Sequence, residues 1–301
     1  MDIPVNRPSL ESQIAGRKLV CPKTLDPLLM EGDRLVSESG TASYPLVDGV
    51  PVLLSADRSA AYLSRLDAAM AIEYTQVRPS ILRSTYQTLE HAVGDMRTAG
   101  AQQAFEAIFS DLPHDALCLS VGGGPTRAHP ALVNLNIGLF ANVDVVADAY
   151  ELPYADGCVD AIHCEAVLEH LEFPDAAVRE MHRVLRPGGR AFAATPFLQS
   201  FHGYPDHYQN FTPTGHRRLF ERAGFEVLSA GTCVGPTFAL RDLATNYIRN
   251  ILPGGKSGRI GSRLFSLLTL PTLWLDRWVN ERSLSSYLAS TTYLGLRKEN
   301  I

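Results

Sequence analysis

The sequence predicts an α/β protein built around a parallel sheet, and three features support this fold class. An apolar run at 116–121 stops abruptly at three glycines, as a buried strand does where it meets a tight turn. Two more short apolar runs follow, at 132–137 and 143–147. Residues 174–186 then show helical spacing of apolar side chains. A tight turn at the carboxyl end of a parallel strand is where open α/β sheets bind nucleotides.

Composition narrows the class of protein further. The chain has 301 residues, of which 46% are hydrophobic and 20% charged, as expected for one large domain or two unequal ones. The net charge is −5, and no block of basic residues occurs, so we expect no nucleic-acid partner.

The cysteines and the apolar runs predict a cytoplasmic protein. Five cysteines form no Cys-x-x-Cys pair, which favours free thiols in a reducing compartment. The first residues contain no apolar signal core, and no run of 18 apolar residues predicts a membrane-spanning helix.

Two segments precede the sheet. Residues 1–56 combine a polar start, predicted to be irregular at 1–17, with short apolar runs, an Asp-Gly pair and prolines, and we expect a compact β module there. Residues 57–112 have a helical pattern and form a linker or lid, with Phe105 as a packing residue. Covering one face of the sheet is the favoured role of this linker, and lining the substrate mouth is the alternative.

The sheet itself occupies 113–234. We expect its strands at 116–121, 132–137, 143–147, 159–163, 190–195 and 225–230, and helices at 174–186 and 214–223. Only 11 residues separate Gly124 from Asn136, and five lie between the second and third strands. Parallel strands normally need a dozen or more connecting residues. The first two crossover helices should therefore be reduced to turns, which opens one edge of the site.

Residues 235–301 are predicted to be a helical insertion followed by a final strand at 290–297. Leucines and two tryptophans alternate there with arginines, and Pro271 interrupts the pattern. Two roles remain open for the insertion. It forms a helical pair packed on the sheet or on a homodimer partner, or it is an amphipathic patch, at 260–282, that contacts a membrane peripherally or holds a lipid-linked substrate.

The order of motifs resembles that of class I S-adenosylmethionine (SAM)-dependent methyltransferases of the type 11 group. The resemblance covers about 113–232 and rests on Asp148-Ala149, Leu152-Pro153-Tyr154, Val159-Asp160, Leu168-Glu169-His170 and the run from Arg183 to Gly189. It implies a Rossmann-like sheet of seven strands, with the last strand antiparallel, and SAM as cofactor.

The resemblance also implies the residues that would bind the cofactor. These are Gly122, Gly123, Gly124, Asn136, Asp148, Ala149, Leu152, Cys164 and Glu165. Three positions depart from the family pattern: Ser120 and Asn136 replace acidic residues, and Thr126 replaces a glycine. An amide still accepts a hydrogen bond from a ribose hydroxyl but lacks the charge that strengthens it.

The N-terminal module resembles the small zinc-ribbon-like domains that accompany several methyltransferases. Its first metal knuckle retains Cys21 but has Thr24 at the second position, and Ser37 and Ser39 stand near the other pair. One cysteine cannot form a tetrahedral zinc site. We therefore expect no metal in the chain.

Catalytic candidates lie in the loop after the strand at 190–195. His202, Tyr204 and His207 follow the carboxyl end of that strand, where loops face the ligand crevice. A histidine there is suited to take a proton from an acceptor, although a polar loop held by its own hydrogen bonds is an equal alternative. The family resemblance makes Glu169 and His170 structural, and the segment 202–208 resembles a pattern associated with glycan and natural-product pathways.

Taken together, these features predict a SAM-dependent methyltransferase. The acceptor would be an oxygen or nitrogen of a small molecule, natural product or lipid- or glycan-linked metabolite. Two alternatives stay open: a SAM-fold protein with non-methylating chemistry, and a non-catalytic interaction protein.

Overall fold

The computed structural model describes residues 6–54, 97–203, 206–252, 255–279 and 285–299. The predicted linker helices between 57 and 96 lie outside these residues, but the end of the linker is helical as expected, in α4 (Ala99–Ala107). Phe105 packs from α4 into the core with 4% of its surface exposed, which confirms its predicted role.

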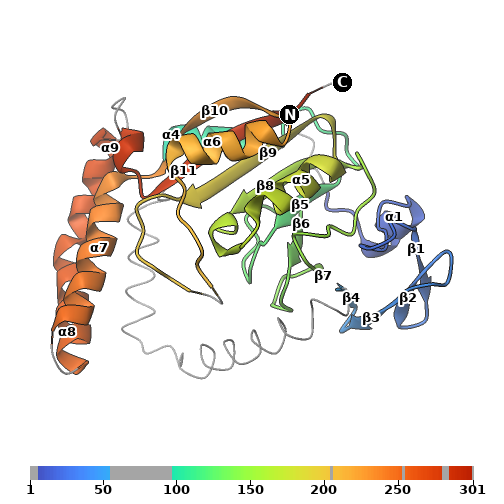
Figure 1. The fold of residues 1–301 in the computed structure, drawn as a ribbon, viewed down its shortest axis with the longest axis horizontal. Coiled ribbons are helices and arrows are strands. Elements are labelled where there is room, and N and C mark those ends of the chain that lie inside the picture. The colour runs from blue at the N-terminus through green and yellow to red at the C-terminus, as the bar shows by residue number, and fades with distance from the viewer. Residues whose placement is uncertain (1–5, 55–96, 204–205, 253–254, 280–284, 300–301) are drawn as a thin grey trace.

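The described residues contain one mixed sheet of eleven strands, in the order β1-β2-β3-β4-β7-β6-β5-β8-β9-β11-β10 (Figure 1). Its central and C-terminal strands are β5 (Cys118–Val121), β6 (Leu132–Asn136), β7 (Val145–Ala147), β8 (Val159–Glu165), β9 (Leu185–Pro196), β10 (Phe225–Val234) and β11 (Thr291–Lys298).

Strand directions confirm the predicted α/β class. Strands β7, β6, β5, β8 and β9 run parallel, and β11 lies antiparallel between β9 and β10. From β5 the chain first adds β6 on one side and later β8 on the other. The strand order therefore reverses between β5 and β8, and this switch point is where such sheets bind ligands.

The sheet has eleven strands rather than seven, because the N-terminal module adds its four strands to the predicted seven, β5 to β11. The module contains α1 (Leu10–Ala15), β1 (Leu28–Glu31), β2 (Arg34–Ser37), β3 (Ser43–Val47) and β4 (Val50–Leu53). Strand β4 pairs in parallel with β7, with Val52 opposite Val146 and Leu53 opposite Ala147. An otherwise exposed sheet edge is covered in this way. Helix α1 also corrects the expectation of irregular chain over residues 1–17.

Hydrogen bonds hold the segments of the module that the sequence predicted to resemble a zinc ribbon. Cys21 is fully buried, and its sulfur lies 3.2 Å from the hydroxyl of Tyr44. Ser37 accepts a hydrogen bond from the amide of Ala42 at 2.9 Å. Cys21 and Ser37 therefore each have a hydrogen-bond partner within the module.

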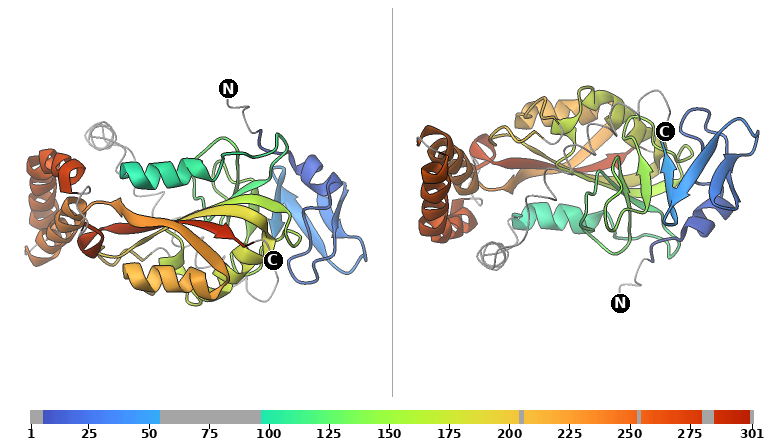
Figure 2. Two further views of the ribbon diagram at one scale, coloured as in Figure 1. Left: turned by 90° about the horizontal axis from the view of Figure 1, so that it is seen from above. Right: turned by 90° about the horizontal axis from the view of Figure 1, so that it is seen from below.

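Helices cover both faces of the sheet (Figure 2). Helix α4 packs on one face, where Phe105 contacts Phe192 at 5.6 Å between ring centroids. Helices α5 (Pro174–Val184) and α6 (Pro213–Arg222) pack on the other face, in the larger apolar cluster. Both helices begin within a residue of the predicted position, at a proline in the first turn.

Turns replace the first two crossover helices, as the chain length predicted. Residues 122–131 and 137–144 contain no helix. An ion pair fastens these two turns to each other: Arg127 Nη1 donates to Asp144 Oδ2 at 2.6 Å. The same carboxylate oxygen accepts from the amide of Asn134 in β6 at 2.7 Å. The short connections are therefore held by polar bonds rather than by a packed helix.

The C-terminal insertion is helical, as predicted, and projects beside one end of the sheet (Figure 1). Its elements are α7 (Pro236–Ile251), α8 (Lys256–Thr269), the 3-10 helix η2 (Leu270–Leu275), α9 (Asp276–Val279) and the 3-10 helix η3 (Ser285–Leu288). Both carboxylate oxygens of Asp276 accept from amides in the first turn of α7, those of Thr237 and Phe238. None of the described helices is long and apolar enough to cross a bilayer.

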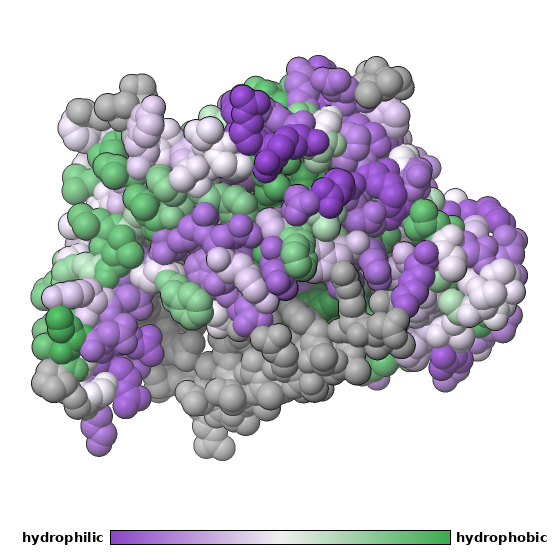
Figure 3. All heavy atoms as spheres, in the orientation of Figure 1, coloured by the Kyte–Doolittle hydropathy of each residue, from purple (hydrophilic) through white to green (hydrophobic). Residues whose placement is uncertain are grey.

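The contact between α7 and α8 is made of small and polar residues. A Cβ atom at Gly258 would lie 2.2 Å from the carbonyl oxygen of Arg249, so only glycine permits this approach. Ser262 and Ser266 are buried, and the buried Arg241 donates to the Ser266 carbonyl at 2.9 Å. Many large apolar side chains of this hairpin, among them Leu240, Leu264 and Leu268, are exposed (Figure 3).

Candidate functional site

The candidate site lies at the carboxyl ends of β5 and β8, on both sides of the switch point. The glycine turn follows β5. The segment from Cys164 to His170, which includes the 3-10 helix η1 (Leu168–His170), follows β8. The two pack tightly, because a Cβ atom at Gly122 would lie 2.3 Å from Val167.

Two of the three glycines are required by the protein itself. Gly122 and Gly123 donate their amides to the Leu135 carbonyl at 2.8 and 3.2 Å. Gly122 has a φ of 72°, and a Cβ atom at Gly123 would overlap Asn134 Oδ1 at 1.5 Å. Gly124, with a φ of 61°, differs from both because nothing lies within 4 Å of its Cβ position. Only this last glycine faces open space.

The residues predicted to bind the ribose and adenine lie at the ends of the next two strands. Asn136 is 8% exposed, and its side-chain oxygen accepts from the Gly138 amide at 3.1 Å. Asp148 follows β7 and is partly exposed, with one carboxylate oxygen accepting from the Tyr150 amide at 2.9 Å. Ala149 beside it is also partly exposed. All three stand on the same edge of the sheet as the glycine turn.

Leu152 and Cys164 have no surface to offer a ligand. Leu152 is completely buried and Cys164 is 1% exposed, and both belong to the main apolar cluster. Burial raises the pKa of the Cys164 thiol far above its usual range. These two residues, predicted to contact the cofactor, therefore belong to the core of the protein.

Glu165 ends β8 in a chain of polar contacts. Its carboxylate is paired with Arg97 and lies 3.2 Å from His163 Nε2, and His163 Nδ1 lies 3.0 Å from Ser120 Oγ. Burial of Glu165 raises its pKa, but the His163 hydrogen bond and the Arg97 charge outweigh burial and hold the pKa at about 2. The serine that replaces the family's acidic residue is thus part of a buried network.

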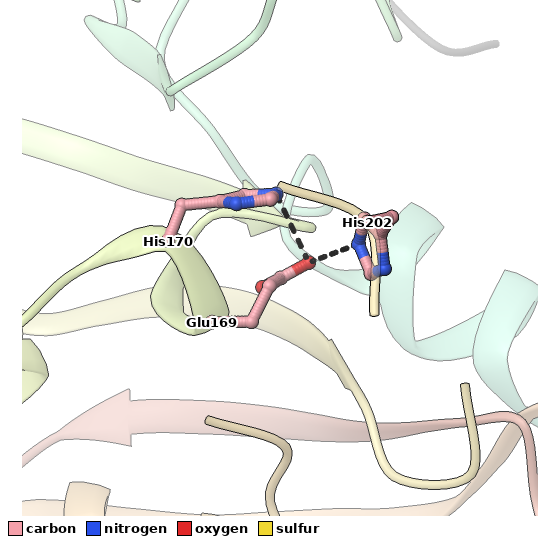
Figure 4. Close-up of side chains that lie close together, drawn as sticks. All are labelled: Glu169, His170 and His202. Carbon is pink, nitrogen blue, oxygen red and sulfur yellow. Dashed lines mark ion pairs between the residues drawn. The ribbon is translucent and has the colours of Figure 1, made fainter. Parts of the chain in front are cut away.

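Glu169 lies four residues further on and has a different environment. It is fully buried, and its Oε2 accepts from Thr195 Oγ1 at 3.3 Å, whereas its Oε1 has no hydrogen-bond partner. Burial raises the pKa of Glu169 to about 7. Oε1 points toward two histidine rings, with His170 Nε2 at 3.8 Å and His202 Nε2 at 4.0 Å (Figure 4).

The loop after β9 brings a third histidine to this group. The His207 ring centroid lies 4.4 Å from that of His202 and 5.9 Å from that of His170. His207 Nδ1 accepts from the His202 amide at 3.2 Å, and Nε2 lies 2.8 Å from Asn210 Oδ1. Both ring nitrogens of His207 are therefore engaged. Tyr204, the remaining catalytic candidate, lies outside the described residues.

Comparison with known proteins finds a family match over part of the chain. Residues 127–193 match a family model described as a methyltransferase domain. The match spans β6 through most of β9 and includes Asn136, Asp148 and Glu169. It supports the class I methyltransferase expected from the motifs, and SAM as its cofactor.

Relatives of this chain are distant or match it over short stretches. The chain is 30% identical to an uncharacterized 37.1 kDa protein in transposon TN4556 of Streptomyces fradiae, over 49% of this chain and 45% of that protein. An uncharacterized chloroplastic methyltransferase of Arabidopsis thaliana is 50% identical over 18% of this chain and 15% of its own length. The chain thus spans less than half the length of either relative.

Among solved structures, the chain aligns with the 1,6-didemethyltoxoflavin-N1-methyltransferase of Burkholderia thailandensis. The alignment covers 91% of this chain and 100% of that one, at 14% identity and a TM-score of 0.43.

Sequence reasoning missed the role of Glu169 and of Arg97. The resemblance made Glu169 and His170 structural, yet both converge with His202 on one point. Arg97 comes from the segment before α4, 68 residues from its partner Glu165. Local spacing in the sequence does not indicate a contact between residues that lie so far apart in the chain. The one sequence feature that pointed to these residues was the presence of charged residues directly after a buried strand.

Proposed function

We propose that this chain is a SAM-dependent methyltransferase that transfers a methyl group to an oxygen or nitrogen of a small or lipid-linked acceptor. The observation that carries this proposal is the placement of two chemically different groups of residues, the two walls of the proposed site, at the carboxyl ends of the parallel strands beside the switch point. Gly124, Asn136 and Asp148 form one wall. A cluster of histidines around Glu169 forms the other, after β8 and β9.

The first wall fits the cofactor. Open space at Gly124 permits close approach of a ligand to the backbone. Asp148 and Asn136 supply polar oxygens at the ends of neighbouring parallel strands, where a nucleoside would lie. Gly122 and Gly123 already donate to Leu135, so the turn would contribute shape more than hydrogen bonds.

The second wall fits an acceptor that must lose a proton. Bound SAM supplies an electrophilic methyl group on a sulfonium. The His202 side chain is 42% exposed, and its Nδ1–H donates to the Ser200 carbonyl at 2.9 Å. This bond leaves the Nε2 lone pair directed into the cluster. Nε2 is placed to take the acceptor proton as the new bond to carbon forms, while His207 fixes the loop.

Substituting one residue from each wall tests the assignment. Asp148→Ala should weaken SAM binding at least about tenfold, because a charge-assisted contact is lost. His202→Ala should bind SAM as the wild type does but turn over an identified acceptor more slowly. If Asp148→Ala binds SAM normally, the cofactor wall is misassigned. If neither protein binds SAM, the non-catalytic alternative gains support.

We further propose that the hairpin of α7 and α8 rests on an anionic membrane surface and that the acceptor is lipid-linked. The hairpin buries glycine, serine and arginine and exposes large apolar side chains, the reverse of a helix pair in water. Leu240, Leu268 and Trp274 are 70%, 71% and 67% exposed.

Charge favours a bilayer over a second copy of the chain. Span 236–279 contains six basic and two acidic residues, although the whole chain has a net charge of −5. Arg249, Lys256, Arg259 and Arg263 are exposed on the hairpin. Two such basic surfaces would repel each other across a dimer interface, whereas anionic headgroups would attract them.

Vesicle flotation tests whether the hairpin binds a membrane or a second copy of the chain. The protein should float with phosphatidylglycerol vesicles and less with phosphatidylcholine ones, and salt should weaken the association. The variant Leu240→Ser/Leu268→Ser/Trp274→Ser should stay at the bottom. The control Leu29→Ser/Met30→Ser, on exposed residues of the N-terminal module, should float normally. No flotation, together with a wild-type dimer that the triple variant abolishes, would assign the hairpin to dimerisation.

A further inference from the structure

We propose that Glu169, His170 and His202 form a binding site for a divalent transition-metal cation such as Zn²⁺ (Figure 4). One ligand atom from each residue lies within 4.8 Å of the other two. Two histidines and one glutamate are a ligand set that zinc enzymes use when a fourth position stays open for water or substrate. The proposal concerns the same cluster as the proposed acceptor wall but does not depend on methyl transfer. A cation bound at His202 Nε2 would occupy the lone pair that otherwise takes the acceptor proton, so the two roles of His202 belong to the metal-bound and the metal-free chain.

Both histidines present an unprotonated nitrogen to the centre of the cluster. His170 Nδ1 lies 2.6 Å from the Asp206 carbonyl oxygen, and His202 Nδ1 lies 2.9 Å from the Ser200 carbonyl oxygen. A carbonyl only accepts, so each Nδ1 carries the proton and each neutral ring keeps a lone pair on Nε2. Histidines that bind metal through Nε2 are held in this way, by donating the other N–H to a backbone carbonyl.

The third donor is a buried oxygen without a partner. Glu169 is fully buried, and its Oε1 makes no hydrogen bond. Oε2 accepts from Thr195, which fixes the carboxylate so that Oε1 faces the two rings. A buried acceptor that lacks a donor destabilises the folded chain, and a cation bound at this point would remove that penalty.

A cation satisfies this arrangement better than a proton does. Oε1 lies 3.8 Å from His170 Nε2 and 4.0 Å from His202 Nε2, too far for either hydrogen bond. One proton on the carboxyl group would also serve only one of the two rings. Ligands about 2.0–2.1 Å from a tetrahedral zinc lie about 3.4 Å from each other. The two contacts therefore need to shorten by only about 0.5 Å.

The surrounding residues define the number of protein ligands. His207 is adjacent, but its two ring nitrogens are engaged by the His202 amide and by Asn210. It is therefore a positioning residue for His202 rather than a fourth ligand. His202 reaches the cluster from a partly exposed loop, so the remaining coordination position would face the crevice. This inference replaces the expectation, drawn from the degenerate N-terminal knuckle, that the chain binds no metal.

Direct metal titration tests the site without any acceptor. The full chain, free of affinity tag and stripped with a chelator, is titrated with ZnCl₂, and with CoCl₂ for its visible spectrum. The wild type should bind one equivalent, with cobalt bands of a nitrogen–oxygen site and no sulfur-to-cobalt charge transfer. Glu169→Gln and His202→Ala each remove a proposed zinc ligand. Each should weaken zinc binding by about 100-fold, the upper end of the loss that follows removal of a residue that only orients a ligand.

A matched control and a separate readout complete the test. His114→Ala removes an exposed histidine in the loop before β5, at the opposite edge of the sheet, and should leave zinc binding unchanged. His202 is partly exposed, so its variant should fold even if Glu169→Gln does not. Absence of stoichiometric zinc binding, or equal binding by His202→Ala, would overturn the site. SAM titration of the same metal-free samples reports separately on the proposed function.

Discussion

Glu165 and Glu169 stand four residues apart after the same strand, and the fold treats them in opposite ways. Glu165 is paired with Arg97 and His163, and its pKa is held at about 2. Glu169 is more deeply buried and has one weak donor, and burial raises its pKa to about 7. Burial alone therefore does not decide the state of a carboxyl group at this edge; the supply of donors does.

The difference separates a carboxylate that joins two elements of the fold from one that belongs to the proposed site. Arg97, which also lies over the Phe105 ring at 4.5 Å, ties the segment before α4 to β8 through Glu165. Glu169 instead leaves an oxygen facing histidines in the crevice. A buried oxygen without a donor calls for an explanation, and the two histidine rings that Oε1 faces are the reason why we propose a ligand there.

The largest expected effect is the loss of stability when the ion pair between Glu165 and Arg97 is broken. Glu165→Gln removes the charge that Arg97 faces, and this arginine side chain is only 17% exposed. We expect the free energy of unfolding at pH 7 to fall by about 3 kcal/mol, because a mostly buried cation loses its partner. Urea denaturation measures it. Glu172→Gln, at an exposed position, is the matched control and should change stability little. Equal stability of both variants would remove the structural role of Glu165.

The two carboxyl groups should also give pH dependences of opposite sign. The pKa of Glu169 is raised from 4.5 to about 7, so its contribution is full below pH 4.5 and is lost as pH rises through 7. The pKa of Glu165 is lowered from 4.5 to about 2, so its contribution is full above pH 4.5 and is lost as pH falls toward 2. Each shift amounts to about 3 kcal/mol.

Chelator-treated protein is the appropriate sample for this comparison, because a bound cation would lower the pKa of Glu169. Glu169→Gln should remove the loss of stability between pH 5 and 8 that the wild type shows, and Glu165→Gln should retain it. A wild-type stability that rises steadily over this range, with no change in Glu169→Gln, would contradict the assignment.

The smallest expected effect concerns the one donor that Glu169 has. Thr195→Val removes the hydroxyl that donates to Oε2 while keeping the side-chain volume. Stability at pH 8, where the carboxylate is ionised, should fall by about 1 kcal/mol, and at pH 5 by less. Thr195→Ser should restore most of the loss, because it restores the hydroxyl. An equal loss in both variants would indicate packing rather than hydrogen bonding.

The sequence predicted the sheet better than the site. Apolar runs that end at glycine or proline placed the core strands and α5 and α6 nearly correctly, because buried parallel strands and amphipathic helices leave local patterns. Pairing of β4 with β7 was not predictable, since backbone hydrogen bonds at a strand edge leave no side-chain pattern. Predicted cofactor residues reached the right edge of the sheet, but Leu152 and Cys164 proved to be buried beneath it.

The histidine cluster shows the limit of local patterns most clearly. His202 and His207 were selected because they follow a strand at the expected ligand-binding edge, and the structure places both beside His170. Their meeting with Glu169 and His170 depends on how the loop after β9 folds back over η1, where the Tyr208 amide donates to the Glu169 carbonyl. Contacts between loops more than 30 residues apart are decided by tertiary structure alone.

Isothermal titration of the wild-type chain with SAM and with S-adenosylhomocysteine tests the central claim most directly. The crevice at the switch point predicts micromolar binding of at least one of them, at one site per chain. Absence of binding at millimolar ligand would contradict the methyltransferase assignment and would make the crevice, with its histidine cluster, a site for some other ligand.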